Sequence, residues 1–404
     1  MKLGIAPIVM DSEELVMTVD ERSFEAEVAA SDSTISRIAL FTDTFAEVNG
    51  AAHTLRKVAE TVQGLGIGLD VYTYGEENAV EERGSVRILT FDHRLSRTYY
   101  ERLRFELVPD FRVGETWRRA MREHPYDVVH LATPGSMGLV GRALANRSRR
   151  ALVGTYHTHL ADYGAMRSSA AMRKIIHGLS WEFLRWFYAP CVSVLGPTEG
   201  VVEELRRRRF RNQLGVFTRG IDLDLYNVAR RQRQDTDVVT SYVGRLAPEK
   251  NVRFLPDIVS GTQSPVWIIG DGPERPWLEQ KLHRARFTGY LFGEQLANAY
   301  ADSDLLLFPS TTDTFGNVVL EAMASGVVPI VAKGPGPSDF VQHGENAFIC
   351  EGPDGMRDAM TRLIRNPELR LNMRHNARRF AERFDWQHAV QQLLQHYRSA
   401  AVSR

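Results

Sequence analysis

Apolar segments of strand length alternate with longer amphipathic segments along most of the chain from Ile35 onward. Strands that alternate with helices form βαβ units, in which a parallel sheet is covered by helices on both faces. For the first half we predict strands at 38–42, 68–74, 86–91, 128–131, 151–156, 192–194 and 214–217, and helices at 52–64, 111–124, 137–146, 170–188 and 198–207.

A second alternating series follows a short polar stretch, 227–237, which has almost nothing to bury and is therefore predicted to be a linker. Because such sheets bind ligands at the carboxyl ends of their strands, we expect the site between the two halves. For the second half we predict strands at 238–243, 266–269, around Gly289, 305–308 and 328–331, a helix at 315–324, and helices through the tail at 355–400.

The overall composition narrows the class of protein. Lys plus Arg and Asp plus Glu number 50 each, so no global charge favours nucleic acid or a membrane. The only two cysteines, Cys191 and Cys350, are far apart in sequence, which argues against a disulfide framework and suits a reducing cytosol. No apolar run approaches the roughly 18–20 residues that span a bilayer, and the N-terminus lacks the features of a signal peptide. We therefore expect a cytoplasmic protein.

The segment 310–326 is the richest in candidate chemistry. It follows the predicted strand 305–308, and Thr314 is expected to be the N-cap of a helix that Gly326 ends. The first amides of that helix, at Phe315, Gly316 and Asn317, would then be open to an anion such as a phosphate.

The same segment carries Asp313 and, eight positions later, Glu321. Glu321 has mostly apolar sequence neighbours, so its carboxylate needs strong donors, and the two hydroxyls of a ribose would supply them. A helix with one solvent-facing glutamate is an alternative that this spacing leaves open.

Two cations leave the turn after the predicted strand 238–243. That strand ends near Gly244, and Pro248 suits the first position of a helix. Arg245 and Lys250 could together hold a diphosphate and offset the charge that grows on it as a leaving group. A pair of surface cations is the alternative.

Glycine-containing loops follow further strands. Gly270, Asp271 and Gly272 come after the strand 266–269, where glycines serve either close backbone approach to a ligand or a tight turn. In the first half, Asn49 and Gly50 precede a helix and could supply amides to a phosphate.

Two histidines, His157 and His159, follow the predicted strand 151–156. A histidine at a strand end is more often structural than functional. Two histidines without a third ligand do not make a zinc site, so no metal site is predicted.

Together these segments resemble glycosyltransferase family 4, from about Ile35 to Trp386. The TDTFGN motif most resembles that of the bacterial α-mannosyltransferases and related glycolipid transferases, which act on lipid-linked acceptors. The matching segments are FTDTF (41–45) with VNG (48–50), VHLATP (129–134), TYHTH (155–159), VGRLAPEK (243–250), IGDGP (269–273) and TDTFGNVVLEAM (312–323).

The resemblance implies the α/β fold called GT-B, in which two doubly wound Rossmann-like domains face each other across a cleft. It implies a retaining reaction with no cofactor and no required metal, and a GDP- or UDP-linked sugar as substrate. The expected catalytic set is His157, Asp313, Arg245 and Lys250. The expected donor-binding set is Asn49, Gly50, Gly244, Gly270, Asp271, Gly272, Phe315, Gly316, Asn317, Val318 and Glu321.

Individual roles also follow from the resemblance. Glu321 is expected to bind the ribose, the two cations the diphosphate, and His157 and Asp313 hydroxyls of the sugar. Asp313 departs from the family's usual glutamate by one methylene, although the subgroup often has aspartate there. The leaving phosphate is expected to take the acceptor's proton during same-face substitution.

Five parts of the chain are expected. They are an N-terminal extension (1–34), an acceptor-side domain (35–226), the linker (227–237), a nucleotide-sugar-binding domain (238–385) and a C-terminal helix (386–404) that returns to the first domain.

The function expected is transfer of a hexose, mannose or glucose being favoured, from a nucleotide-diphosphate sugar to a lipid-linked or glycan acceptor. The alternatives are a nucleotide-sugar epimerase or hydrolase on the same fold, and a non-catalytic nucleotide-sugar-binding protein peripheral to the membrane.

Basic and aromatic residues mix in two stretches, 166–188 and 91–105. Such stretches suit either the inner face of a cell membrane or a core helix with a solvated basic edge, and both interpretations stay open. The four consecutive arginines at 206–209 fan around a helix end, so they form no single face for nucleic acid, and no nucleic-acid partner is expected.

Overall fold

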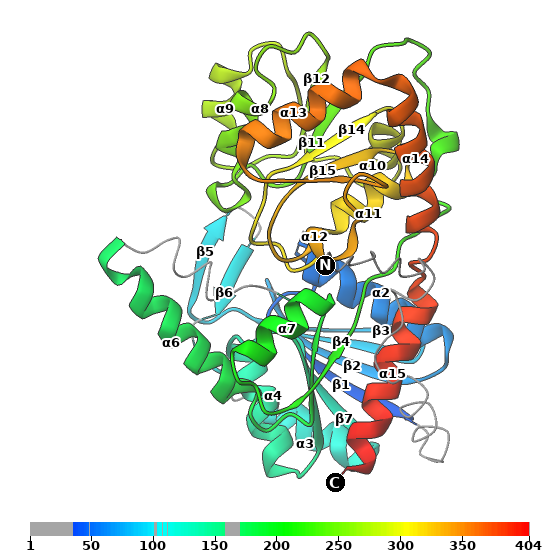
Figure 1. Ribbon diagram of the computed structural model, residues 1–404. Helices are drawn as coiled ribbons and strands as arrows, with labels where there is room; N and C mark the ends of the chain where they lie inside the picture. The colour runs from blue at the N-terminus through cyan, green and yellow to red at the C-terminus, as the bar shows by residue number, and fades with distance from the viewer. Residues whose placement is uncertain are drawn as a thin grey trace, which may run out of the picture.

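The computed structural model describes residues 35–47, 49–100, 103–106, 108–110, 112–157 and 170–403. The predicted extension at 1–34 and the beginning of the basic stretch 166–188 lie outside these residues. Figure 1 shows two α/β domains, with the last helix of the chain running back along the first of them.

The first domain is built on an eight-stranded sheet in the order β10-β9-β8-β7-β1-β2-β4-β3, in which all neighbours are parallel except β3 and β4. Its strands are β1 (Arg37–Phe41), β2 (Gly68–Gly75), β3 (Ala79–Arg83), β4 (Val86–Asp92), β7 (Val128–Leu131), β8 (Ala151–Thr155), β9 (Ser193–Gly196) and β10 (Gln213–Val216). A separate antiparallel hairpin consists of β5 (Ser96–Tyr100) and β6 (Leu103–Glu106).

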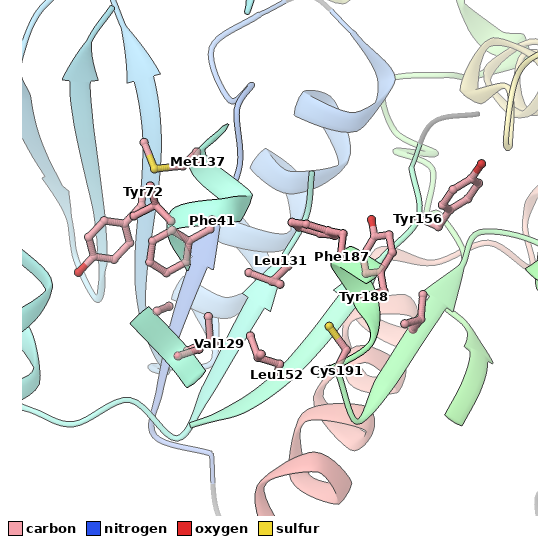
Figure 2. Packing of buried hydrophobic residues seen from close by; sticks show 14 of the residues in the cluster. Phe41, Tyr72, Val129, Leu131, Met137, Leu152, Tyr156, Phe187, Tyr188 and Cys191 are labelled. Atoms are coloured by element: carbon pink, nitrogen blue, oxygen red, sulfur yellow. The ribbon is translucent and has the colours of Figure 1, made fainter. Parts of the chain in front are cut away.

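Helices cover both faces of this sheet because successive strand residues point to opposite sides. In β1, Ala39 and Phe41 belong to one apolar cluster, and Ile38 and Leu40 to the other. Figure 2 shows the first cluster, in which Phe41 lies beside Tyr72. The first face carries α3 (Val113–Glu123), α4 (Ser136–Arg147), α6 (Ala170–Tyr188) and α7 (Glu199–Arg207), and the second carries α2 (Gly50–Gly64) and α15 (Trp386–Val402).

The second domain has a six-stranded, all-parallel sheet in the order β13-β12-β11-β14-β15-β16. Its strands are β11 (Thr240–Val243), β12 (Val266–Ile269), β13 (Arg286–Gly289), β14 (Leu305–Phe308), β15 (Val328–Ala332) and β16 (Phe348–Cys350). Its helices are α8 (Leu255–Ile258), α9 (Arg275–Lys281), α10 (Gly293–Ala301), α11 (Asn317–Ala324), α12 (Pro337–Phe340), α13 (Gly352–Arg365) and α14 (Pro367–Ala381), with short 3₁₀ turns η1 (Val228–Arg230), η2 (Pro248–Lys250) and η3 (Val252–Phe254).

In each sheet the first strand in the chain lies inside the sheet and has a later strand on either side. β1 lies between β2 and β7, and β11 lies between β12 and β14. Two doubly wound, Rossmann-like halves are therefore present, which confirms the predicted fold class. The strands that the sequence did not predict are β3, β5, β6 and the three-residue β16, most of them polar, short or at an edge.

The chain changes domain twice, and the two crossings lie side by side. Phe217 packs in the core of the first domain, whereas Ile221 already packs in the second. The Ile221 amide donates to the carbonyl oxygen of Phe384 (3.1 Å), just before α15 returns to the first domain. Gly220 is pressed against the second crossing, because a Cβ there would lie 2.4 Å from the Trp386 nitrogen.

The polar stretch 227–237, predicted to be the linker, is held against the second domain. Arg231 and Arg233 reach the buried carboxylate of Asp304 at 3.2 and 3.6 Å. The amide of Gln232 donates to Asp302 at 2.7 Å. The stretch is polar because its arginines pair with the buried carboxylate of Asp304 at the start of β14, and the change of domain comes earlier, between Phe217 and Ile221.

Candidate active site

The candidate site begins where β11 and β14 end, at the point where the chain order of the second sheet reverses. These two strands are direct neighbours, with Thr240 paired to Leu305. The segment after β11 carries Arg245 and Lys250, and the segment after β14 carries Asp313. Parallel sheets bind ligands at such points, so both segments are brought to the expected place.

Lys250 and Asp313 are in direct contact. The Lys250 Nζ lies 2.5 Å from Asp313 Oδ1, and the two side chains are 15% and 20% exposed. Two further bonds join the loops. The Thr312 hydroxyl donates to the carbonyl oxygen of Glu249 (3.0 Å), and the side-chain amide of Asn251 donates to the carbonyl oxygen of Pro309 (3.1 Å). The cation is therefore fixed in place by the loop that carries the carboxylate.

Arg245 leaves the same turn and remains partly exposed. Its Nη1 lies 3.9 Å from Glu249 Oε1, and its carbonyl oxygen accepts a bond from the Tyr242 hydroxyl (2.9 Å). The side chain is 21% exposed. A guanidinium has the fork geometry that binds a bidentate anion such as a phosphate.

Helix α11 begins two residues later than predicted, and Thr314 is not its N-cap. The cap is Gly316, which has a left-handed backbone (φ 79°) and supplies no side-chain bond. A Cβ at Gly316 would lie 2.6 Å from Pro337 Cγ, so the position requires glycine for both reasons. The amides of a first helical turn have no partner within the helix, and here they belong to the turn that starts at Asn317.

Thr314 instead connects the two domains. Its hydroxyl donates to the carbonyl oxygen of His157, which follows β8 in the first domain (2.7 Å). A second interdomain bond runs from the Thr198 hydroxyl to Asp339 Oδ2 (2.7 Å). Loops at the carboxyl ends of the second domain's strands are therefore in direct contact with the strand ends of the first domain.

The start of α2 faces the start of α11 across this junction. A Cβ placed on Gly50 would lie 3.6 Å from the side-chain Nδ2 of Asn317. Asn49 is the N-cap of α2, and its side-chain oxygen accepts from the Ala52 amide (2.8 Å). Two helix N-termini, which both favour anions, thus approach from opposite domains.

Glu321 is buried on α11, at 8% exposure, and two tyrosines donate to it. The Tyr300 hydroxyl lies 2.9 Å from its Oε2, and Tyr226 forms a second side-chain bond. Burial raises the pKa of Glu321 to about 7, with the two tyrosine bonds acting in the opposite direction. A carboxylate accepts about four hydrogen bonds, so two acceptor positions remain for a ligand's hydroxyls.

His157 is held by the protein on both sides of its ring. Its Nε2 lies 2.8 Å from the Thr155 hydroxyl, and its Nδ1 lies 2.8 Å from Arg219 Nη2. Burial, with the nearby Arg219 and His130, holds the pKa of His157 well below its usual value. The imidazole is neutral, and both nitrogens are engaged inside the protein, so direct contact with a sugar hydroxyl stays a prediction.

The glycines around the end of β12 are required by packing against their neighbouring loop. Gly270 (φ 140°) and Gly272 (φ 154°) have no room for a Cβ, which would lie 1.9 Å from the Gly244 oxygen and 2.4 Å from the Leu246 oxygen. Asp271 pairs with Arg275 at 2.6 Å. This loop shapes the turn that carries Arg245, and its glycines allow the two loops to approach closely; contact of these glycines with a ligand stays a prediction.

Sequence reasoning missed Arg219, Tyr226 and Tyr300. Arg219 comes directly after the first domain's last strand, Tyr226 stands just before the polar stretch, and Tyr300 ends an ordinary amphipathic helix. No motif marks any of them. Only Glu321 itself indicated them, because a carboxylate in an apolar helix requires hydrogen-bond donors nearby. The sequence does not say which residues these donors are.

Comparison with known proteins now adds to this geometry. A sequence model described as Glycosyltransferase Family 4 matches residues 48–225, and one described as Glycosyl transferases group 1 matches residues 237–366. The chain belongs to glycosyltransferase family 4. Both halves of this family 4 glycosyltransferase are thus covered, and the family predicted from the sequence motifs is confirmed.

Relatives of this family 4 protein extend over most of its length. It is 28% identical to a GDP-mannose-dependent alpha-mannosyltransferase of Corynebacterium glutamicum, over 89% of this chain and 88% of the relative. It is 29% identical to a protein of the same description from Mycobacterium tuberculosis, over 91% and 98%. It is 27% identical to sulfoquinovosyl transferase SQD2 of Arabidopsis thaliana, over 98% and 81%.

Solved structures support the fold of the family 4 chain. Sucrose-phosphate synthase from Thermosynechococcus elongatus superposes with a TM-score of 0.76 at 20% identity, covering 91% of this chain and 100% of that one. The Anabaena protein HepE, solved in complex with UDP, superposes with a TM-score of 0.69 at 19% identity, covering 89% and 98%. Both confirm the two-domain architecture.

Two features are absent from the described residues of this family 4 protein. No described helix has the length and apolar character needed to cross a bilayer. No group of three or more His, Cys, Asp or Glu side chains in the described ranges is arranged to hold a metal ion. The predicted metal independence remains a prediction.

Proposed function

We propose that this glycosyltransferase transfers a hexose, mannose or glucose, from a GDP- or UDP-linked donor to a lipid-linked or glycan acceptor. We further propose that it retains the anomeric configuration and needs no metal. The relatives named for GDP-mannose-dependent transfer support mannose, and an alpha-monoglucosyldiacylglycerol synthase of Acholeplasma laidlawii, 26% identical over 64% of this chain, supports a lipid acceptor.

One observation carries the proposal: the groups suited to a nucleoside diphosphate converge from three segments. Lys250 comes from the β11 loop, and Asp313 from the β14 loop at 2.5 Å. The start of α11 adjoins them and faces Gly50 of the other domain. Two cations and two helix N-termini at one junction suit a ligand with two phosphates.

Each group has a distinct part in the proposed reaction. The acceptor hydroxyl oxygen bonds to the anomeric carbon while the bond from that carbon to the phosphate oxygen breaks. The acceptor's proton moves to the leaving phosphate on the same face. Lys250 and Arg245 offset the negative charge that grows on the diphosphate, and the amides at the start of α11 add to this effect.

Asp313 has two uses in this proposal. It fixes the Lys250 ammonium, and its carboxylate can accept a bond from a sugar hydroxyl. Glu321 would accept bonds from the ribose hydroxyls, two turns further into the same domain. We therefore assign the nucleotide to the second domain and the acceptor to the first.

The surface of α6 suggests how the acceptor is reached. Met172, Ile175, Leu179 and Trp186 are each between 46% and 63% exposed, and their spacing places them along one side of the helix. Arg173 and Lys174 are exposed beside them. An exposed apolar stripe with adjacent cations fits the interface of an anionic membrane, and Figure 1 shows α6 projecting at the side of the first domain.

A donor panel tests the nucleotide site. Thermal unfolding should be followed with GDP-, UDP- and ADP-sugars, since a ligand that binds only the folded state raises the midpoint with concentration. At least one GDP- or UDP-sugar should raise it, and the E321A variant should respond far less at the same concentrations. If no donor shifts the folded wild-type protein, the proposed donor class is wrong.

Product analysis separates the alternatives. A glycosylated acceptor supports transfer, whereas an epimerised or simply hydrolysed donor supports the other enzyme classes. Donor binding without any turnover, in the presence of lipid-linked acceptors, supports the non-catalytic alternative.

A further inference from the structure

A continuous chain of buried hydrogen bonds runs from the domain crossing to the C-terminal helix. Its members are all in the lowest exposure range of the protein, from 0% to 9%. In order they are Arg219, His157, Thr155, His130 and Tyr397, with successive donor–acceptor distances of 2.8, 2.8, 2.8 and 2.7 Å.

Arg219 determines the direction of both bonds that the His157 ring makes. A guanidinium can only donate, so Nδ1 of His157 must accept, and the proton of His157 must sit on Nε2. That N–H donates to the Thr155 oxygen. The Thr155 oxygen keeps its own proton and a second lone pair, and both face Nε2 of His130 at 2.8 Å.

The remaining link joins His130 to Tyr397. Burial lowers the pKa of His130 to about 3, so its ring is neutral, with Nε2 at the Thr155 hydroxyl and Nδ1 at the Tyr397 hydroxyl. The tautomer of His157 is thus fixed by one cation at one end of the chain.

Arg219 also lies where the two domains meet. Its guanidinium donates to the carbonyl oxygen of Phe217 (3.2 Å) and lies 5.8 Å from the ring centroid of Phe315, at the end of the loop between β14 and α11. Among the described residues no carboxylate forms an ion pair with it, and burial lowers its pKa to about 9. A buried cation is costly, so its presence at this junction calls for a role beyond packing.

We propose that Arg219 is a positioning residue, which sets the tautomer of His157 and holds it against Thr314 of the loop between β14 and α11. This inference rests on the proposed glycosyl transfer. Arg219 bonds to the ring of His157, and Thr314 bonds to its carbonyl oxygen. These bonds fix three segments relative to one another: the domain crossing at 217–221, the end of β8, and the loop between β14 and α11. Losing Arg219 should misplace the loop that carries Thr314 relative to the first domain, without removing the nucleotide's own contacts in the second domain.

A double-mutant cycle on the full-length protein tests the coupling. Arg219→Met and His157→Phe should each lower kcat by about twentyfold or more, while the affinity for the nucleoside diphosphate stays within about threefold of wild type. The double variant should be no more than about threefold slower than the worse single variant. Independent, multiplying losses, or an R219M variant with nearly wild-type kcat, would overturn the proposal.

Two variants of Thr155 test the proposal if the R219M protein does not fold. Thr155→Val breaks the next link without touching Arg219, and Thr155→Ser keeps the hydroxyl. We expect T155V to lower kcat by at least about tenfold and T155S to restore it, at similar unfolding midpoints. Equal kcat values for T155V and T155S would contradict a chain that acts through its hydrogen bonds.

The tautomer of His157 can be measured without any activity. Long-range ¹H–¹⁵N correlation on histidine-labelled wild-type protein should show His157 protonated at Nε2, with assignment by the H157F variant. A His157 ring protonated at Nδ1 would overturn the inference even in an active enzyme. Protonation at Nε2 in a protein that transfers no sugar from any donor would instead refute the proposed function and leave the tautomer assignment standing.

Discussion

Lys250 and Asp313 lie 63 positions apart in the sequence, and yet Lys250 Nζ is 2.5 Å from Asp313 Oδ1. Each follows the end of one of two adjacent parallel strands, β11 and β14, so the sheet itself brings them together. The pair therefore follows from the order of the strands, and it fixes a cation at the point where a nucleotide diphosphate is expected to bind.

The Lys250→Met variant should lose most of the activity. Removing a fixed cation from a developing negative charge typically costs about a hundredfold to a thousandfold in kcat. Steady-state transfer kinetics measure this. The Lys250→Arg control keeps the charge and should retain more activity than K250M, and both should unfold within a few degrees of wild type. Comparable activity in K250M and wild type would exclude Lys250 from the reaction.

Donor affinity should rise with pH through neutrality because of Glu321. In the free protein burial raises the pKa of this carboxyl to about 7, so it is partly protonated at neutral pH. Ribose hydroxyls donate to the ionised form, so binding releases a proton, and the dissociation constant should fall as the pH rises from 6 to 8.

Titration calorimetry of the nucleoside diphosphate over that range checks this prediction. The Glu321→Gln variant is the control, because in this variant only the phosphate of the ligand changes its protonation over that range. It should bind about tenfold more weakly at pH 8 and show the shallower pH profile. Parallel profiles for the two proteins would mean that Glu321 does not bind the ligand as proposed.

Two glycine substitutions should have opposite effects. Gly50→Ala fits sterically, since its Cβ would lie 3.6 Å from the nearest atom, and alanine favours a helix start. Its unfolding midpoint should be unchanged or slightly raised, while the added methyl group raises the KM for the donor by about tenfold. Gly316→Ala adds a Cβ to a residue with a left-handed backbone and brings that Cβ against Pro337. The substitution should therefore cost about 1–3 kcal/mol of stability. Thermal unfolding together with donor KM distinguishes the two, and a G50A variant with wild-type KM would remove Gly50 from the site.

The exposed stripe on α6 should govern membrane binding. The double variant Ile175→Ser with Leu179→Ser should bind anionic phospholipid vesicles about tenfold or more weakly, with unchanged turnover of a water-soluble acceptor. Leu371→Ser is a matched control, because Leu371 is 54% exposed on the other domain. Vesicle sedimentation measures binding, and equal binding by both variants would place the membrane contact elsewhere.

The order of elements was predictable because the apolar periodicity is strong. The strands 128–131, 266–269 and 305–308 and the helix 170–188 have the predicted bounds. β3 was missed because all five of its residues are exposed and polar residues dominate it, so it has no buried face to give a period. The hairpin of β5 and β6 was missed for a related reason, since its residues mix charges and aromatics without alternation.

The site was only partly predictable. The lysine, the aspartate and the start of α11 stand in motifs, whereas the cap at Gly316 depends on the left-handed backbone and the neighbouring Pro337, which no local rule encodes. Thr314 has the residue type of a cap, but its hydroxyl satisfies a carbonyl of the other domain. Arg219 owes its importance to where the chain changes domain, which the sequence placed about ten residues too late.

The most direct measurement is the stereochemistry of transfer. The protein should be incubated with an α-linked GDP- or UDP-hexose and a lipid-linked acceptor, and the anomeric coupling of the product read by ¹H NMR, with K250M as the control. The account predicts an α-linked product from the wild-type protein and little product from K250M. A β-linked product, or equal transfer by both proteins, would contradict it.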